Sequence, residues 1–220
     1  FGTDAVILAD FARAKKSDTL VDLGTGCGII PFLMLRDGNL KSAAGVDISE
    51  EAAALAKRTS SELKTDNFTV INSDLNDLKG KIGFGCHTLV TCNPPYKAPN
   101  GGLKNNDSVS AVARHEIACT LGDVISVSAR LLETSGRLCM CHRPERLSEL
   151  FTLMSKYKLE PKRMRLVCQR TGKEPWLVLI EGRKCAKTGM RIEPTLYVYE
   201  DDGFSPEMIR IYGPYKEAYL

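Results

Sequence analysis

The sequence predicts an α/β fold in which short apolar strands alternate with helices. The apolar run 18–23 enters a glycine-rich turn at 24–28 that opens into a helix. Short apolar stretches of strand length then recur at 43–46, 68–71 and 88–92. At 220 residues the chain is long enough for one α/β domain with a buried core.

The other elements follow from local patterns. Residues 1–14 predict a first helix, because apolar residues recur at helical spacing behind a Thr3/Asp4 cap. Pro31 stands early enough to be tolerated in the first turn of the second helix. Further along the chain we expect a polar loop at 97–108, a helix carrying Arg114-His115-Glu116, a helix at 121–132, a strand at 136–142, a helix that starts at 143–147 with Pro144 near its first position, and strands at 159–168 and 176–181.

The turn 24–28 predicts a site for a nucleotide-type cofactor, because its glycines let the backbone approach a ligand closely. Its Gly-x-Gly-x-Gly spacing departs from the dinucleotide fingerprint, and nothing else suggests hydride transfer, so an oxidoreductase is disfavoured. Asp47 ends the second strand, where a carboxylate can accept hydrogen bonds from both ribose hydroxyls. Asp74 follows the third strand and can accept from an adenine amino group while Leu75 packs on the ring.

Asn93-Pro94-Pro95-Tyr96 follows the fourth strand. Two prolines remove two backbone donors and fix φ, so the loop is stiff and its carbonyls are free to accept hydrogen bonds. The tetrapeptide can present a planar amino group to an electrophile, with Tyr96 stacked on the base, although Asn-Pro and Pro-Pro also mark ordinary turns.

Taken together, these motifs resemble the S-adenosylmethionine-dependent methyltransferases of the Rossmann-like class. The Phe-Gly-Thr-Asp opening, the tetrapeptide at 93–96, Arg114-His115-Glu116 and the strand 177–182 are most similar to the bacterial tRNA(Val) adenine-N6 methyltransferase family. The resemblance implies a seven-stranded, mostly parallel sheet with the last strand antiparallel and helices on both faces. It implies a single domain over 1–220 with a C-terminal extension from about 186. It also implies cofactor contacts from Gly2, Thr3, Asp22, Gly24, Thr25, Gly26, Gly28, Asp47, Ile48, Asp74, Leu75 and Asn93, and methyl transfer at Asn93, Pro94, Pro95 and Tyr96.

Composition sets further limits. No apolar run approaches the roughly 20 residues that span a bilayer, so we expect no membrane association. Four of the eight cysteines, Cys92, Cys139, Cys141 and Cys168, lie in apolar segments as small buried hydrophobes, which favours a reducing, cytoplasmic setting. No Cys-x-x-Cys pair is present and only three histidines occur, so we expect no metal. The chain starts at Phe1 without a basic and apolar leader, so we expect a trimmed start rather than a mature secreted chain.

Positive charge is concentrated in residues 156–191, which carry 11 Lys and Arg against three Glu. Arg163 and Arg165 alternate with Met164 and Leu166, which predicts the arginines on a solvent face. We expect residues 170–173 at the tip of the last hairpin. This basic region is a candidate surface for tRNA or another structured RNA, although charge runs are often only a solvated face.

The leading hypothesis is methyl transfer from S-adenosylmethionine to an exocyclic amino nitrogen, adenine N6 in tRNA foremost. Protein glutamine-N5 methylation of release factors stays open, since those enzymes share the tetrapeptide. So does guanine-N2 methylation of rRNA or tRNA. A non-catalytic module that binds S-adenosylmethionine is the alternative from another class.

Overall fold

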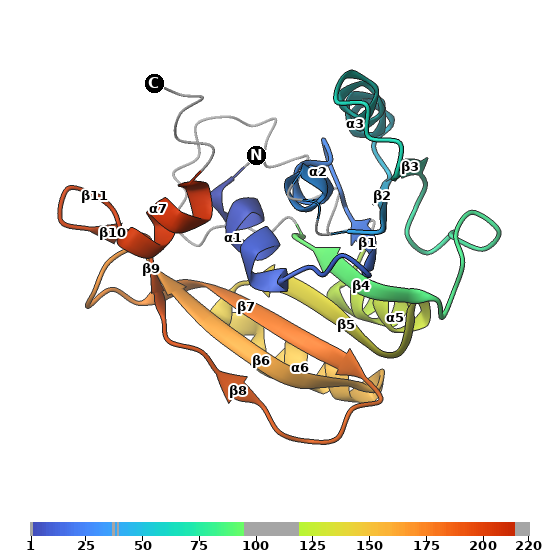
Figure 1. Cartoon of the computed structure of the whole chain (residues 1–220). Coiled ribbons are helices and arrows are strands. Elements are labelled where there is room, and N and C mark those ends of the chain that lie inside the picture. Colours follow the sequence, from blue (N-terminus) through green and yellow to red (C-terminus); the bar gives the residue numbers. More distant parts are fainter. Residues whose placement is uncertain (1, 37, 39, 95–118, 214–220) are drawn as a thin grey trace, which may run out of the picture.

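The computed structural model describes residues 2–36, 38, 40–94 and 119–213, and its long strands form one mixed sheet (Figure 1). The elements in chain order are α1 (Thr3–Ala12), β1 (Thr19–Leu23), α2 (Ile29–Arg36), β2 (Ser42–Asp47), α3 (Glu50–Glu62), β3 (Phe68–Asn72), β4 (His87–Cys92), α5 (Leu121–Leu131), β5 (Leu132–His142), the 3-10 helix η1 (Pro144–Arg146), α6 (Leu147–Lys156), β6 (Leu159–Cys168), β7 (Pro175–Lys184), β8 (Arg191–Ile192), β9 (Leu196–Tyr197), β10 (Tyr199–Glu200), β11 (Gly203–Phe204) and α7 (Pro206–Tyr212).

The strand order is β3-β2-β1-β4-β5-β7-β6-β8, with β9 also paired to β6. Neighbours from β3 through β5 run parallel, whereas β7 is antiparallel to both β5 and β6. The expected mostly parallel sheet with its last long strand antiparallel is therefore confirmed. Within the described residues, β8 and β9 add two two-residue strands to the expected seven. The loops after β1 to β6 all leave the sheet on one side, which we call the carboxyl edge.

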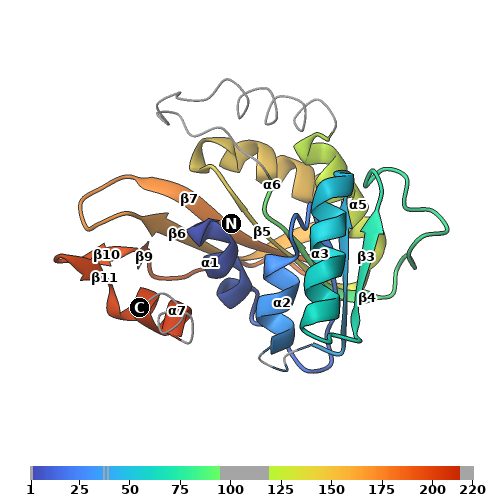
Figure 2. The same cartoon turned by 90° about the horizontal axis from the view of Figure 1, so that it is seen from above.

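Helices cover both faces of the sheet, as expected (Figures 1 and 2). One apolar core lies between the sheet and the helices α1, α2, α3 and α7, with Leu8 and Met208 fully buried. The second core lies between the sheet and α5 and α6, where Leu150 and Met154 are fully buried. Since strands buried on both faces are apolar on both sides, the near-continuous apolar runs at β1 and β4 follow from this layering.

Several predicted elements need correction at their ends. Gly2, not Thr3 or Asp4, is the N-cap of α1, and it makes no side-chain cap hydrogen bond. The helix α3 was not predicted, and neither were the short strands and the helix within the expected extension after β7. The N-terminus of α3 is marked by Ser49, whose hydroxyl accepts a 3.2 Å hydrogen bond from Ala52 N. The expected loop at 97–108 and Arg114-His115-Glu116 lie outside the described residues.

The expectation that Arg163 and Arg165 face solvent is wrong. Arg163 is only 7% exposed, and its guanidinium donates to Glu181 Oε2 at 2.8 Å and contacts Glu193 Oε1 at 3.5 Å. Arg165 forms a two-pronged pair with Glu207, at 2.6 and 2.8 Å. The alternation along β6 does place Arg163 and Arg165 on one face of the sheet. The residues after β7 cover that face, so neither arginine faces solvent.

These residues after β7, 186–213, form an extension that packs against the first helix. Arg210 holds both carboxylate oxygens of Asp10, at 2.7 and 3.0 Å, and the Tyr212 hydroxyl lies 3.3 Å from Thr3 Oγ1. The apolar side chains of Leu196 and Val198 are buried in the same core as α1. Figure 1 shows the extension beside α1 and the far end of the β6–β7 hairpin.

All eight cysteines are free, and Cys92, Cys139, Cys141 and Cys168 are buried in strands as predicted. Within the described ranges, no three His, Cys, Asp or Glu side chains gather in a way that could hold a metal ion. None of the helices that the structure describes has the length and apolar character needed to cross a bilayer.

Candidate active site

The glycine-rich turn connects β1 to α2 at the carboxyl edge. Gly24 and Gly26 have φ of +69° and +55°, a conformation that glycine adopts without a steric cost. The amides of Gly24 and Thr25 both donate to Val46 O, at 2.9 and 3.0 Å, which ties the turn to the end of β2. A Cβ built on either glycine would meet no described atom within 4 Å, so the turn presents bare backbone to open space.

Asp47 closes the other side of the turn from the end of β2. Its Oδ2 accepts from Gly26 N at 2.7 Å and its Oδ1 from Ser49 N at 2.9 Å, and the residue is 7% exposed. A carboxylate offers about four acceptor positions, so each oxygen can accept one more hydrogen bond. The Asn72 amide donates to Asp47 O and Ile48 O, at 3.0 and 3.1 Å, and thereby fixes the backbone on which this carboxylate stands.

Asp22 is the next-to-last residue of β1, and its carboxylate is buried, with the residue 1% exposed. Its Oδ1 accepts from Thr91 Oγ1 at 2.6 Å, whereas its Oδ2 has no hydrogen-bond partner in the part of the chain that the structure describes. The Thr25 hydroxyl is also buried and unpartnered; it lies close enough to lower the pKa of Asp22, but without the geometry of a hydrogen bond. Burial raises the pKa of Asp22 to about 7, against the lowering effect of the Thr91 hydrogen bond. Among the described residues, no basic side chain forms an ion pair with this carboxylate.

Asn93 follows β4 at the same edge. The buried thiol of Cys141, on the neighbouring strand β5, lies 3.0 Å from Asn93 Oδ1 and donates to it. Because β4 and β5 are parallel with Cys92 opposite Met140, the next residues along each strand, Asn93 and Cys141, come side by side. The thiol uses one lone pair of the amide oxygen and leaves the other free to accept.

Two small adjoining cavities connect these groups. A cavity of about 60 Å³ has Asp47, Ile48, Asp74 and Leu75 in its wall, and Ile48 is 45% exposed. A second cavity of about 90 Å³ is lined by Leu23, Gly24, Leu75, Cys92, Pro94, Cys119, Thr120, Leu121, Val124, His142 and Arg146. Since Gly24, Leu75 and Cys119 line both, the glycine turn, the acids after β2 and β3 and the start of the tetrapeptide share one cleft.

The structure therefore brings most of the expected residues together at one edge. The expected residues that line one or both cavities are Gly24, Asp47, Ile48, Asp74, Leu75 and Pro94. Five others stand in or beside the same strand ends and glycine turn without lining either cavity: Asp22, Thr25, Gly26, Gly28 and Asn93. Gly2 and Thr3 do not line a cavity either, and they lie at the start of α1, where Thr3 is next to Tyr212. Pro95 and Tyr96 lie outside the described residues.

Sequence reasoning missed Cys119, Asn72, Cys141, His142 and Arg146. Cys119 and Asn72 stand next to expected elements, but nothing in their local sequence marks them. The other three become visible only when β5 is known to be the neighbour of β4, because its carboxyl end then lies beside the tetrapeptide. The signal was the strand order, which local sequence does not carry.

Comparison with known proteins places the chain in a family. Residues 2–149 match the family model described as methyltransferase small domain. A tRNA1(Val) (adenine(37)-N6)-methyltransferase of Porphyromonas gingivalis is 28% identical over 97% of this chain and 87% of its own length. A protein of the same name from Bacteroides thetaiotaomicron is 26% identical over 91% of this chain and 85% of its own length.

Among solved structures, a predicted O-methyltransferase of Agrobacterium tumefaciens superposes with a TM-score of 0.77 at 18% identity. The superposition covers 96% of each chain, and at this identity it supports the fold alone. The family match, which spans both cavities and the start of the tetrapeptide, supports the activity. The chain belongs to the methyltransferase small domain family and is an S-adenosylmethionine-dependent methyltransferase.

Proposed function

We propose that this enzyme methylates the exocyclic N6 of an adenine in tRNA. The observation that carries the proposal is the shared cavity: Pro94, at the start of the tetrapeptide, lines the same space as Gly24 of the glycine turn. A group held by Asn93 and Pro94 would therefore lie next to whatever the glycine turn binds.

The residues of the cleft fit S-adenosylmethionine, which supplies an electrophilic methyl group when bound. The unpartnered, buried Oδ2 of Asp22 is suited to the ammonium of the methionine part, because a cation offsets the cost of keeping this carboxylate ionised. The two free acceptor positions of Asp47 suit the two ribose hydroxyls. Ile48 and Leu75 offer apolar walls for the adenine, with the carboxylate of Asp74 beside its amino edge.

Asn93 and Pro94 would hold the target amino group. An amino nitrogen conjugated to a ring is a poor nucleophile, since its lone pair is delocalised into the π-system. When Asn93 Oδ1 and the Pro94 carbonyl accept its two hydrogens, the nitrogen is drawn towards tetrahedral geometry and its lone pair faces the methyl group. The thiol of Cys141 keeps Asn93 Oδ1 in place for this contact. Catalysis then rests on positioning and preorganised acceptors rather than on a nucleophilic side chain.

The choice of adenine in tRNA rests on the relatives, which align with nearly the whole length of this chain and whose name specifies adenine 37 of tRNA1(Val). The distribution of charge is compatible with RNA. Arg143 and Arg146 follow β5, and Arg170 and Lys173 stand at the tip of the β6–β7 hairpin, so all four lie at the carboxyl edge. Lys156, Lys158 and Lys184 lie at the opposite edge, so we propose that only part of the basic region at 156–191 contacts the RNA.

The test is methyl transfer from labelled S-adenosylmethionine to unmodified tRNA1(Val) by the wild type and by Asn93→Ala. We expect N6-methyladenosine from the wild type and none from Asn93→Ala, which still binds S-adenosylmethionine because its glycine turn and Asp47 are intact. Equal activity of the two proteins would refute the role of Asn93.

Parallel arms separate the competing substrates. N2-methylguanosine in the digested RNA would identify a guanine-N2 methyltransferase. Label on a release factor, with none on RNA, would identify the glutamine-N5 methyltransferase. Binding of S-adenosylmethionine without methyl transfer to adenine, to guanine or to the release factor would favour a non-catalytic module.

A further inference from the structure

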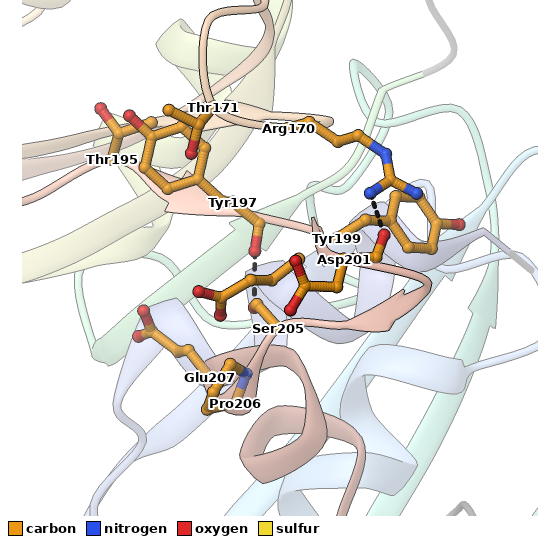
Figure 3. Close-up of a pocket in the computed structure, with 10 residues that line it drawn as sticks. Arg170, Thr171, Thr195, Tyr197, Tyr199, Asp201, Ser205, Pro206 and Glu207 are labelled. Atoms are coloured by element: carbon orange, nitrogen blue, oxygen red, sulfur yellow. Dashed lines mark hydrogen bonds between the residues drawn. The ribbon is translucent and has the colours of Figure 1, made fainter.

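A third cavity, of about 660 Å³, lies between the tip of the β6–β7 hairpin and the C-terminal extension (Figure 3). Its size is within the range of small-molecule sites, roughly 300 to 1,000 Å³. Arg170 and Thr171 border it from the hairpin, and the extension supplies Thr195, Tyr197, Tyr199, Glu200, Asp201, Ser205, Pro206 and Glu207.

The cavity lies on the same edge of the sheet as the methyl-transfer cleft. Tyr197 of β9 pairs with Cys168, the last residue of β6, and the hairpin tip follows directly. From β4 the strands run β5, β7, β6 and β9, which is four spacings. At about 4.8 Å per spacing the cavity is roughly 19 Å from Asn93 along the edge. An RNA with its target base at Asn93 can therefore reach the cavity with a nucleotide a few positions away.

Two tyrosines give the cavity aromatic surface. Tyr199 is stacked on Phe204, with ring centroids 5.3 Å apart and an interplanar angle of 13°, and the guanidinium of Arg170 lies 5.5 Å above its ring. Arg170 also donates to Asp201 O, as Figure 3 shows. Tyr197 is 37% exposed, and among the described residues no ring or cation is found against its face. One tyrosine is thus held in place, whereas the ring of the other is available for stacking.

The polar atoms around these rings are mostly acceptors. Glu207 is held by Arg165, whose two hydrogen bonds lower the pKa of this carboxyl, so it stays ionised and can only accept. Glu200 is exposed at the rim of the cavity, and its side-chain oxygens can also accept hydrogen bonds. Carboxylates of this kind match a base with an exocyclic amino group, which donates two hydrogens. Arg170 spends one donor on Asp201 O and keeps others for a ribose or phosphate oxygen.

We propose that this cavity binds an unpaired, amino-bearing nucleotide of the RNA substrate, with its base stacked on Tyr197 and its amino edge towards Glu200 and Glu207. The proposal rests on RNA being the substrate. The contact anchors the RNA while another of its bases occupies the methyl-transfer cleft, so it affects binding of the RNA and not the chemical step.

The first experiment compares steady-state methylation of unmodified tRNA by the wild type, Tyr197→Ala and Tyr197→Phe. Loss of one stacked base predicts a KM for tRNA about 5- to 100-fold higher in Tyr197→Ala, with kcat and the affinity for S-adenosylmethionine unchanged. Tyr197→Phe is the matched control, because it keeps the ring, and it should stay close to the wild type. An unchanged KM in Tyr197→Ala, or a loss confined to kcat, overturns the proposal.

The second experiment reports on the cavity without methylation. Tyr197→Trp introduces a tryptophan into the cavity, and its fluorescence is obtained by comparison with the wild type, which contains only Trp176. Short single-stranded oligonucleotides should quench this fluorescence, and those of adenine or cytosine should quench it more than those of uracil. Absence of quenching overturns the proposal. So does quenching by the polycation spermidine but not by the oligonucleotides, because that result identifies a cation site. If the wild type methylates no RNA at all, the proposed function fails, and the quenching still decides whether the cavity binds a nucleotide.

Discussion

Replacing Asp22 by Asn should stabilise the free protein and weaken its binding of S-adenosylmethionine. The carboxylate is 1% exposed, and its Oδ2 has no partner, so ionisation is opposed by burial. In Asp22→Asn the Thr91 hydrogen bond to Oδ1 can persist. The new amide can donate to the unpartnered Thr25 hydroxyl. The substitution therefore removes a buried charge, and one of the two new amide hydrogens gains an acceptor.

The magnitude follows from the pKa of Asp22. Its rise from 3.8 to about 7 corresponds to about 4 kcal/mol, since each pKa unit is about 1.36 kcal/mol. Because the pKa is raised on folding, the folded state binds more protons than the unfolded state between about pH 4 and 7. The contribution of Asp22 to the wild-type free energy of unfolding therefore falls as the pH rises through this interval, and it levels off above pH 7. The gain in Asp22→Asn should be close to zero near pH 4 and reach up to about 4 kcal/mol at pH 8.

The assay is urea unfolding of both proteins from pH 4 to 8, together with calorimetric titration of S-adenosylmethionine. Loss of the charged hydrogen bond between Asp22 and the ammonium of the methionine part predicts a Kd for S-adenosylmethionine about 10- to 100-fold higher in Asp22→Asn. Asp18→Asn is the control, because Asp18 is also buried but is paired with Arg137 at 2.8 Å. Loss of this charge pair should lower the free energy of unfolding. A variant that is less stable than the wild type at pH 8, or that binds S-adenosylmethionine normally, would refute the reasoning.

Three further predictions concern the support of the site and the fold. Cys141→Val removes the donor to Asn93 Oδ1 and should lower kcat about 5- to 10-fold without changing the affinity for S-adenosylmethionine. Cys141→Ser keeps a donor and should retain activity. Equal kcat values for the two variants would contradict the role of this hydrogen bond. Glu181→Gln removes the carboxylate that Arg163 contacts at 2.8 Å, while Asp18 still pairs with Arg137 and Glu193 with Arg163, so the loss of this charged hydrogen bond should cost about 1.5 to 3 kcal/mol in urea unfolding. Glu149→Gln at the exposed Arg146 pair should cost no more than about 1 kcal/mol, and similar losses for the two would count against the buried cluster. Gly45→Ala places a Cβ 2.7 Å from Thr25 Cγ2 and should weaken S-adenosylmethionine binding by displacing the glycine turn, which titration calorimetry can check; unchanged binding would show that the turn tolerates the shift.

The part of the fold that binds the cofactor could be predicted because its signals are local. Gly24, Gly26 and Asp47 are found where an apolar strand ends, and the structure places all three around one cleft. The buried cysteines followed in the same way from apolar runs, whereas the pairing of β6 and β7 as a hairpin followed from the family resemblance.

What failed depends on contacts between distant segments. Arg163 alternates with apolar residues as a surface arginine would, and it is buried because Glu181, Glu193 of the extension and Phe11 of α1 contact its guanidinium. The partnership of Cys141 with Asn93 spans 48 residues and exists only through the order of the strands. The cavity around Tyr197 combines the hairpin with the extension, whose four two-residue strands are too short to leave a periodic pattern.

The central claim is that the enzyme methylates adenine N6 in tRNA. The most direct test is mass spectrometry of tRNA nucleosides, and of tryptic release-factor peptides, from cells with and without the gene. We expect loss of the gene to remove N6-methyladenosine from tRNA1(Val), and the gene carrying Asn93→Ala not to restore it. Unchanged N6-methyladenosine, with N2-methylguanosine or N5-methylglutamine lost instead, would contradict it.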